Sequence, residues 1–512
     1  MNKLLNGKSD ISRIIGLECV DSSVEIFIQQ EDGSVVSEFR PHRYWILTHN
    51  KLAANAVKLE GDLHYKYGYQ FATREDFEKT RSSIRNEDSY SIYNAEEACM
   101  VKDGYTFYRD LKPTDLAVLS FDIETTGLDG EADDAKVLLI STTYRDHNGK
   151  SVNRLFSYDD YKNEGELITS FCSYVRQVNP SVIIGHNIIT YDFPYLKARA
   201  EANNVTLELG RNNSQVKFNH YESKFRLDGT RDLLYKNISI YGREICDTYF
   251  LSVSFDVSKS FETYALKPLI KQLGFEKQGR QYYDAGEIRK NYKISSEWLK
   301  IKQYAIDDAE DPIKLFDMMS PTYFYSCQNI PKPFSEVILS ATGSKINSML
   351  VRSYLQDKHS IPKSTDMTGL KLEGGISFGV PGLYKNALKI DLKSCYPSQI
   401  LRFQIYDRDK DPYGHFYQIV KYFTEKRFEY KELAKKTKDS HYINLDNTSK
   451  IFINSAYGTL STVGLNFNSP ENAAKITKES RKIIDLALKW ASGKGVDYWM
   501  EKYGNKEFES DI

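Results

Sequence analysis

The chain has 512 residues, of which 41% are hydrophobic and 27% charged, and its formal net charge is −1. This length is enough for several domains, and the composition is that of an ordinary soluble protein. The near-neutral charge excludes a globally basic nucleic-acid-binding protein, so a nucleic-acid partner has to meet a local basic surface.

The sequence shows no run of roughly 20 apolar residues and no apolar signal-peptide core near its start, so we predict no membrane association. Its six cysteines are scattered and form no Cys-x-x-Cys pair. This pattern indicates a reducing cytoplasm and argues against a disulfide framework or a zinc ribbon.

Residues 1–110 are predicted to form an N-terminal domain of short strands and polar helices. The run 23–28 is typical of a strand, and Asp32-Gly33 of a turn. We recognise no group of catalytic residues here. The segment 112–114 (Lys-Pro-Thr) marks the predicted boundary to the next domain.

Alternating strands and helices follow. Apolar runs at 116–124, 136–144 and 181–185 predict three strands, and the segment 165–178 predicts a helix before the third. This order is typical of an α/β core.

A long helix is predicted over 296–319, after a region at 201–245 that we expect to contain a hairpin. Pro312 lies inside this helix and is predicted to kink or split it. A new region begins near 331–333 (Pro-Lys-Pro).

Two carboxylates lie at the end of the first strand of this α/β core. Asp122 and Glu124 are two residues apart, so on a strand they point to the same face. On a buried strand they repel each other unless a cation lies between them. The alternative is a strand end with solvated acids, because Asp-x-Glu is a common sequence.

Three further residues extend this candidate metal site. Asp192 follows the strand at 181–185 and a short loop, where catalytic groups of α/β proteins tend to lie. Tyr304 and Asp308 are four residues apart and share one face of the predicted helix.

Four carboxylates in one place suit phosphodiester hydrolysis. Two divalent cations about 3.5–4 Å apart neutralise charge on the attacking and leaving oxygens. Mg²⁺ and Mn²⁺ prefer oxygen ligands. Tyr304 is placed to hydrogen-bond the attacking water.

The segments 121–124 (Phe-Asp-Ile-Glu), 187–192 (Asn-Ile-Ile-Thr-Tyr-Asp) and 304–308 (Tyr-Ala-Ile-Asp-Asp) resemble, in this order, the three 3′–5′ exonuclease motifs of the family B DNA polymerases. The resemblance implies an RNase H-like proofreading domain with two Mg²⁺ or Mn²⁺ ions.

The same resemblance implies a role for each acid. Asp122 would bridge both metals, Glu124 and Asp308 would hold the metal of the nucleophilic water, and Asp192 would support the pair.

Three other residues enter through this resemblance. Thr126 and Asn187 are implied to contact the single-stranded 3′ end of a primer. Asp247 also matches a recurring stretch of the family. We interpret Asp247 as structural, because its neighbours predict a strand end and the metal set is already complete.

Residues 391–398 (Asp-Leu-Lys-Ser-Cys-Tyr-Pro-Ser) resemble motif A of the polymerase site of this family, with Cys395 in place of Leu. They begin at the end of a strand predicted over 388–392. The resemblance implies that Asp391 binds metal and that Tyr396 excludes nucleotides with a 2′-hydroxyl.

Residues 373–375 (Glu-Gly-Gly) resemble the Tyr-x-Gly-Gly motif between the exonuclease and polymerase domains, with Leu372 in place of Tyr. This implies DNA contacts at Gly374 and Gly375.

Residues 450–458 (Lys-Ile-Phe-Ile-Asn-Ser-Ala-Tyr-Gly) match motif B of the family in full. Lys450, Asn454 and Tyr457 share one helical face and are implied to bind the incoming dNTP.

A basic helical stretch over 421–438 contains Arg427 and Lys431, again four residues apart. A solvated helix face is one interpretation. Beside motif B, a triphosphate-binding fingers helix is favoured, and it is the best local basic patch in the chain.

The second metal-binding carboxylate of the palm is missing. The family supplies it in motif C, and no Asp-Thr-Asp occurs in the 512 residues. One carboxylate cannot hold two cations for nucleotidyl transfer. We therefore expect these residues alone not to polymerise DNA.

The resemblance then points to the N-terminal part of a split polymerase, a form known among tailed bacteriophages; a truncated or intein-interrupted chain would give the same sequence. We expect a partner chain with motif C and thumb, docked on apolar helix faces near 473–491 and an unpaired palm strand edge. Primer–template DNA, a sliding clamp and a single-strand-binding protein are further expected partners, in a bacterial host cytoplasm if phage-encoded.

The predicted fold class is α/β and α+β, in several domains. The expected domains are an N-terminal domain at 1–110, the RNase H-like exonuclease at 111–325, the return segment and first part of the palm at 326–400, the fingers helices at 401–465, and a partial palm at 466–512.

Three functions stay open. The favoured one is a proofreading exonuclease joined to an incomplete polymerase. The second is a stand-alone 3′–5′ exonuclease, and the third is a non-catalytic DNA-binding or scaffold subunit. The four mutually repelling acids argue against the third, because a scaffold does not need them.

Overall fold

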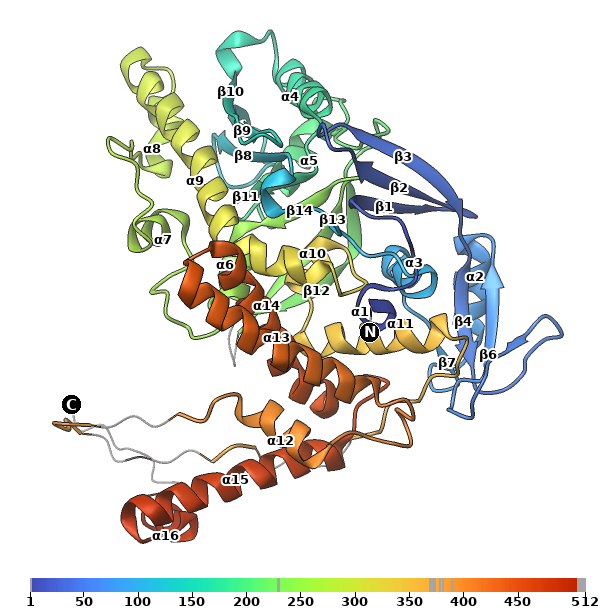
Figure 1. Cartoon of the computed structure of the whole chain (residues 1–512). Helices are drawn as coiled ribbons and strands as arrows, with labels where there is room; N and C mark the ends of the chain where they lie inside the picture. Colours follow the sequence, from blue (N-terminus) through green and yellow to red (C-terminus); the bar gives the residue numbers. More distant parts are fainter. Residues whose placement is uncertain are drawn as a thin grey trace.

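A computed structural model describes residues 2–227, 231–367, 374–376, 379, 382–387 and 391–503 of the chain. Its sheets lie in the N-terminal half of the chain, and its longest helices follow them (Figure 1). None of the described helices combines the length and apolarity that a membrane-spanning helix needs.

Two antiparallel sheets and three helices form the N-terminal part. One sheet has the order β1-β2-β3 and the other β5-β6-β4-β7. Their bounds are β1 (Ile14–Val20), β2 (Ser23–Gln29), β3 (Val35–Pro41), β4 (Tyr44–Thr48), β5 (Val57–Lys58), β6 (Tyr67–Phe71) and β7 (Ser89–Tyr90). The helices are α1 (Asn2–Asn6), α2 (Arg74–Ser83) and α3 (Ala95–Asp103).

A five-stranded mixed sheet of order β10-β9-β8-β11-β14 forms the centre of the next part. The strand β8 pairs antiparallel with β9 and parallel with β11. The bounds are β8 (Val118–Thr125), β9 (Val137–Arg145), β10 (Ser151–Ser157), β11 (Val182–Gly185) and β14 (Glu244–Asp247). The three strands predicted from the apolar runs are confirmed.

The two faces of β8 have different surroundings. Phe121 packs against Phe171 of α4 (Glu164–Val178) and Phe193 of α5 (Asp192–Ala202), at ring-centroid distances of 5.5 and 5.1 Å. Because side chains alternate along a strand, Asp122 and Glu124 point to the opposite face, which α9 (Ser295–Cys327) covers.

The long helix α9 has 33 residues and contains both Pro312 and Pro321. The helix is therefore not split at Pro312, and a kink there stays a prediction. Pro312 has no N–H to donate to the carbonyl of Asp308, but it is buried against neighbouring elements, and this packing holds the helix together.

The predicted hairpin is confirmed as the antiparallel pair β12 (Lys217–Arg226) and β13 (Asp232–Ser239). The remaining short elements of this part are η1 (Pro113–Asp115), η2 (Tyr158–Asp160), α6 (Thr248–Phe255), α7 (Leu266–Gln272) and α8 (Ala285–Asn291).

Among the described residues after β14, the regular elements from residue 334 onward are all helices. They include the pair α13 and α14, in which Phe423 and Phe452 stack at 3.9 Å. The bounds of the C-terminal helices are α10 (Phe334–Leu339), α11 (Thr342–Gln356), α12 (Cys395–Phe403), α13 (His415–Thr437), α14 (Ser440–Ser461), α15 (Pro470–Ser492) and α16 (Val496–Tyr503).

The predicted palm strand at 388–392 falls mainly on 388–390, which lie outside the described residues, and Asp391 and Leu392 are not in a strand. The partial palm and its strand edge therefore stay predictions. The mixed α/β character and the division into several parts are confirmed.

Candidate nuclease and nucleotide sites

Three of the four predicted acids meet between β8 and α9. One carboxylate oxygen from each of Asp122, Glu124 and Asp308 lies within 4.8 Å of the other two. Glu124 and Asp308 are buried, at 7% and 6% exposure. We call this group the three-acid cluster.

Asp192 lies beside the three-acid cluster rather than in it. It is the first residue of α5, and its Oδ1 accepts the backbone N–H of Ile123 at 3.2 Å. This bond holds the carboxylate against the backbone of β8, where its charge helps to raise the pKa of Asp122.

Burial and mutual repulsion make these carboxyl groups hard to ionise in the absence of metal. Burial, and then the neighbouring Glu124, raises the pKa of Asp122 well above its usual range. Burial and Asp308 do the same to the pKa of Glu124. Burial and Asp247 raise the pKa of Asp192 to about 8.

Two cations that the sequence patterns did not reveal offset part of this charge. The ammonium of Lys267, on α7, lies 3.4 Å from Asp308 Oδ2. Arg280 is almost fully buried and pairs with both Asp308 and Asp311. Neither residue stands at a recognisable spacing from the acids, since Lys267 lies on the short helix α7 and Arg280 in the loop between α7 and α8.

Tyr304 lies one helical turn before Asp308 and faces the same site. Its hydroxyl accepts a hydrogen bond from Lys267, whose Nζ also lies 4.3 Å from the Tyr304 ring centroid. Burial, then Glu124 and Asp308, raises the pKa of Tyr304, so the hydroxyl keeps its proton.

Asp247 stabilises the loop between β11 and α5 through hydrogen bonds to its backbone. Its carboxylate accepts the backbone N–H of Asn187 at 2.8 Å and of Ile189 at 3.0 Å, and it also caps α6. A Cβ at Gly185 would lie 2.6 Å from the carbonyl oxygen of Phe121, so only glycine fits where this loop leaves the sheet. The geometry agrees with the structural role predicted for Asp247.

The two residues predicted to contact the primer, Asn187 and Thr126, form hydrogen bonds within the chain. Asn187 has a positive φ of 73°, and its side chain accepts a hydrogen bond from Thr190. Thr126 is buried, and its hydroxyl donates to the carbonyl of Asp134 and accepts the N–H of Lys136, each at 2.9 Å. Their contacts with DNA stay predictions.

Residues of the two polymerase-like motifs also come together. Tyr396, on α12, and Tyr457, on α14, have ring centroids 5.0 Å apart. A Cβ on Gly375 would lie 3.7 Å from the Tyr396 hydroxyl, which places this glycine beside motif A. Gly374 and Asp391 are exposed.

Arg427 connects these motifs. From α13 it donates to Ser394 Oγ at 2.9 Å and pairs with Asp446 of α14 at 3.2 Å. On α14, Lys450 and Asn454 are exposed on the face they share with Tyr457. Lys431 is half-buried one turn after Arg427.

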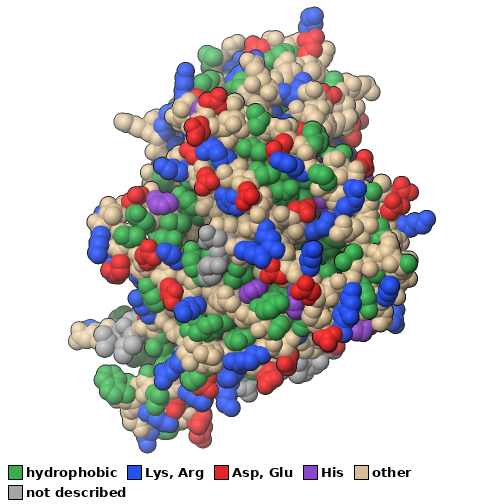
Figure 2. Space-filling model, turned by 45° about the vertical axis from the view of Figure 1, so that its right-hand side comes forward, with side chains coloured by type: hydrophobic (Ala, Val, Ile, Leu, Met, Phe, Trp, Pro, Cys, Tyr) green, Lys and Arg blue, Asp and Glu red, His purple; other side chains and the backbone are tan. Residues whose placement is uncertain are grey.

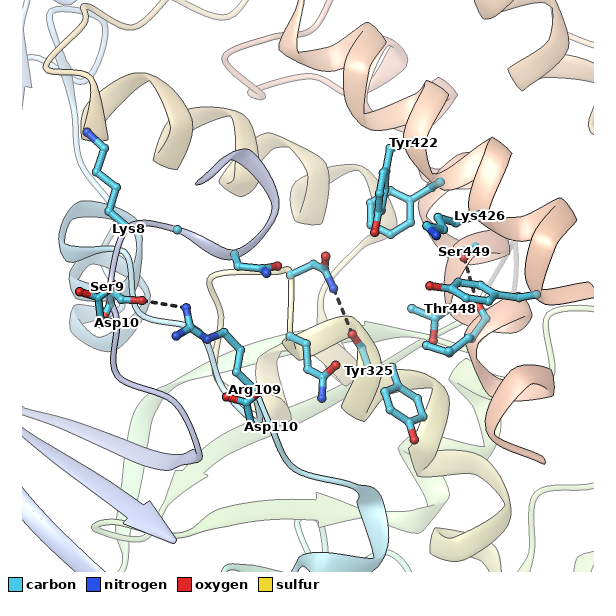
Figure 3. Close-up of a pocket in the computed structure, with 17 residues that line it drawn as sticks. Lys8, Ser9, Asp10, Arg109, Asp110, Tyr325, Tyr422, Lys426, Thr448 and Ser449 are labelled. Atoms are coloured by element: carbon cyan, nitrogen blue, oxygen red, sulfur yellow. Dashed lines mark hydrogen bonds between the residues drawn. The ribbon is translucent and has the colours of Figure 1, made fainter. Parts of the chain in front are cut away.

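A separate polar cavity of 590 Å³ lies between the N-terminal segment, the end of α9, and the α13–α14 pair (Figure 3). Arg109 donates there to the carbonyl of Ser9 at 2.7 Å, while Tyr422 and Lys426 approach from α13. None of the predicted site residues lines this cavity, so it is distinct from both candidate sites.

Comparison with known proteins agrees with this geometry. Residues 71–266 match the sequence model of the DNA polymerase family B exonuclease domain. DNA polymerase 1 of Pyrococcus abyssi is 24% identical over 417 residues, which cover 74% of this chain and 52% of that protein. The DNA polymerase of Thermococcus gorgonarius is 24% identical over 433 residues, covering 78% and 53%.

The fold is also shared. The structure of the family B DNA polymerase of Pyrobaculum calidifontis superposes with a TM-score of 0.74 at 20% identity, over 93% of this chain and 71% of that one. The chain spans about half the length of the curated relatives it matches. The chain is thus similar to family B DNA polymerases in sequence and fold, and its residues 71–266 match the exonuclease domain of that family.

Proposed function

We propose that this chain is a metal-dependent 3′–5′ exonuclease acting on single-stranded DNA ends. The three-acid cluster is the observation that supports this most strongly, because buried carboxylates within 4.8 Å of one another need compensating charge. Its all-oxygen donor set fits Mg²⁺ or Mn²⁺, held by Asp122, Glu124 and Asp308 with Asp192 behind them. Two such ions would supply an activated water and charge neutralisation at the phosphodiester.

The protein's own groups then orient the reaction. The Tyr304 hydroxyl, protonated and held by Lys267, lies beside Asp308 and would donate its hydrogen to the attacking water. Lys267 offsets negative charge beside Asp308. In this proposal Asn187 and Thr126, which lie on the loops next to the acids, contact the 3′ end of the primer.

A 3′–5′ assay tests this function. The full chain is incubated with a 5′-labelled single-stranded oligonucleotide and Mg²⁺, and we expect shortening from the 3′ end that EDTA stops. A preparation that leaves the substrate intact would instead favour a DNA-binding or scaffold subunit, and binding measured by anisotropy would then identify it.

A second activity, template-directed DNA synthesis, is favoured by the convergence of Tyr396, Tyr457 and Arg427. In this proposal Asp391 is one palm ligand, Gly374 and Gly375 contact DNA, and the dNTP-binding residues are Tyr396, Arg427, Lys431, Lys450, Asn454 and Tyr457. The proposed domains are those expected from the sequence, at 1–110, 111–325, 326–400, 401–465 and 466–512.

We propose that synthesis needs a further polypeptide segment, because the 512 residues contain no Asp-Thr-Asp motif to complete the metal site. Leu486 and Trp490 on α15 are 65% and 81% exposed, and they suit contact with such a segment. Primer extension by the 512 residues alone would contradict this. A clamp and a single-strand-binding protein remain expected partners.

In this proposal DNA binds to a local group of basic side chains, because the chain as a whole is nearly neutral. On the face shown in Figure 2, basic and acidic side chains are interspersed. The exposed Lys450 and the basic residues of α13 provide a local exception.

A further inference from the structure

Two thiols and an imidazole converge in the N-terminal part, on elements separate from those of the three-acid cluster (Figure 1). Cys19 lies on β1, His42 between β3 and β4, and Cys99 on α3. One ligand atom from each lies within 4.8 Å of the other two.

His42 is the member whose environment lacks an explanation. Its side chain is fully buried, and neither ring nitrogen has a partner within hydrogen-bond distance, since the Asp103 carboxylate lies 3.9 Å from Nδ1. A buried polar group without a partner is costly, and native proteins rarely leave one. A cation bound to one ring nitrogen would satisfy it.

Asp103 supplies a fourth ligand type at the same place. It follows Cys99 by one helical turn, and its Oδ2 lies 3.5 Å from Cys99 Sγ and 3.9 Å from His42 Nδ1. Its side chain is 26% exposed, so an ion can enter from solvent on this side.

We propose that this site binds one structural Zn²⁺ ion through Cys19, His42, Cys99 and Asp103. Zinc prefers four tetrahedral ligands of the sulfur, nitrogen and carboxylate types, with ligand atoms roughly 3.3–3.8 Å apart. Cys19, His42 and Cys99 need only a small contraction from their 4.8 Å limit, whereas Asp103, which lies outside this group of three, has to move toward Cys19. No redox step is involved, because each thiol releases one proton to solvent as its sulfur bonds the ion.

The ion would join segments that are distant in sequence. It ties β1 and the β3–β4 connection to α3, which Trp45 also holds by donating to the carbonyl of Ala98 at 3.0 Å. On its other side, Glu97 of α3 pairs with Lys332 at 2.6 Å and accepts from Ser348 at 2.7 Å. The site therefore stabilises the attachment of the N-terminal sheets to the helices that follow.

Metal analysis of the full chain, purified without chelators, tests the proposal. The variant Asp122→Asn provides the background, so that ions at the three-acid cluster do not confuse the count. We expect about one zinc per chain by mass spectrometry of the elements, reduced at least about tenfold in Cys19→Ser, Cys99→Ser and His42→Ala. Cys172→Ser, which removes a buried free thiol on α4, is the matched control and should retain the ion.

Replacement of zinc by Co²⁺ in the chain with its cysteines intact tests whether thiolates bind the ion, even if a cysteine variant fails to fold. Co²⁺ bound to thiolates gives a charge-transfer band that an all-oxygen site cannot give, so we expect this band in the chain with its cysteines intact. Absence of both zinc and the band would overturn the proposal. So would zinc that persists in the Cys19→Ser/Cys99→Ser double variant, or a Cys19–Cys99 disulfide in freshly purified protein.

Discussion

The ammonium of Lys267 lies 3.4 Å from the carboxylate of Asp308. This ion pair joins α7 to Asp308 of α9, beside the acids of β8. It means that the candidate nuclease site is a mixed-charge site, in which the metal ions that we propose would act together with a lysine.

Removal of Lys267 should therefore impair hydrolysis. We expect Lys267→Ala to lower the rate of 3′–5′ degradation by roughly 10²-fold, because a preorganised positive charge is lost where negative charge develops. The exposed Lys271→Ala, one turn later on α7, is the matched control and should keep the wild-type rate. Equal rates for the two variants in a single-turnover assay would refute this role.

Loss of a metal-binding acid should be more severe. Asp122→Asn is expected to reduce degradation by about 10³-fold or more, since charge neutralisation by metal contributes several kcal/mol. The exposed Asp133→Asn has the same change in charge in the same part of the chain and should have no effect. Both rates can be measured on a labelled oligonucleotide in Mg²⁺.

The acids should also make the metal-free protein less stable as the pH rises. The pKa of Asp192 is about 8 in the folded chain, against a usual value of 3.8, and those of Asp122 and Glu124 are raised as well. Above pH 4 the unfolded chain loses these protons while the folded chain retains them, so the stability falls between about pH 4 and pH 8.

Thermal unfolding checks this prediction. In EDTA the Tm should fall across that pH range, and the increase in Tm on adding Mg²⁺ should grow with pH. Asp122→Asn should raise the Tm in EDTA and reduce the effect of Mg²⁺. The Asp122→Asn variant has the same histidines, so the difference in Tm between it and the unchanged chain removes their contribution. If this difference does not change from pH 5 to pH 8 in EDTA, the raised pKa of Asp122 is contradicted.

Asp247 should act through the loop that it holds. Asp247→Ala removes an acceptor from the backbone N–H groups of Asn187 and Ile189, and we expect about 2–4 kcal/mol of destabilisation. Urea denaturation measures this loss. Because Asp247 is not in the three-acid cluster, the folded variant should keep more residual activity than Asp122→Asn; the reverse order would make Asp247 a metal ligand.

Local patterns in the sequence were sufficient for most elements around the site. The apolar run ending at Asp122 predicted β8, and the four-residue spacing of Tyr304 and Asp308 predicted their shared face on α9, because both depend on the repeat of a single element. Of the kink or split predicted at Pro312 from the same local rule, the split is wrong, because the helix continues through the buried proline.

The sequence by itself determined which acids form the candidate nuclease site and in which order the strands and helices carry them. Only the tertiary structure decided that Asp192 lies outside the three-acid cluster, that Lys267 and Arg280 pair with Asp308, and that Cys19, His42 and Cys99 meet although no Cys-x-x-Cys pair joins them. The physical reason is the separation along the chain over which each effect acts. The periodicity of one helix or strand fixes the direction of its own side chains. Charge compensation and the clustering of metal ligands depend on segments that become neighbours only when the elements pack.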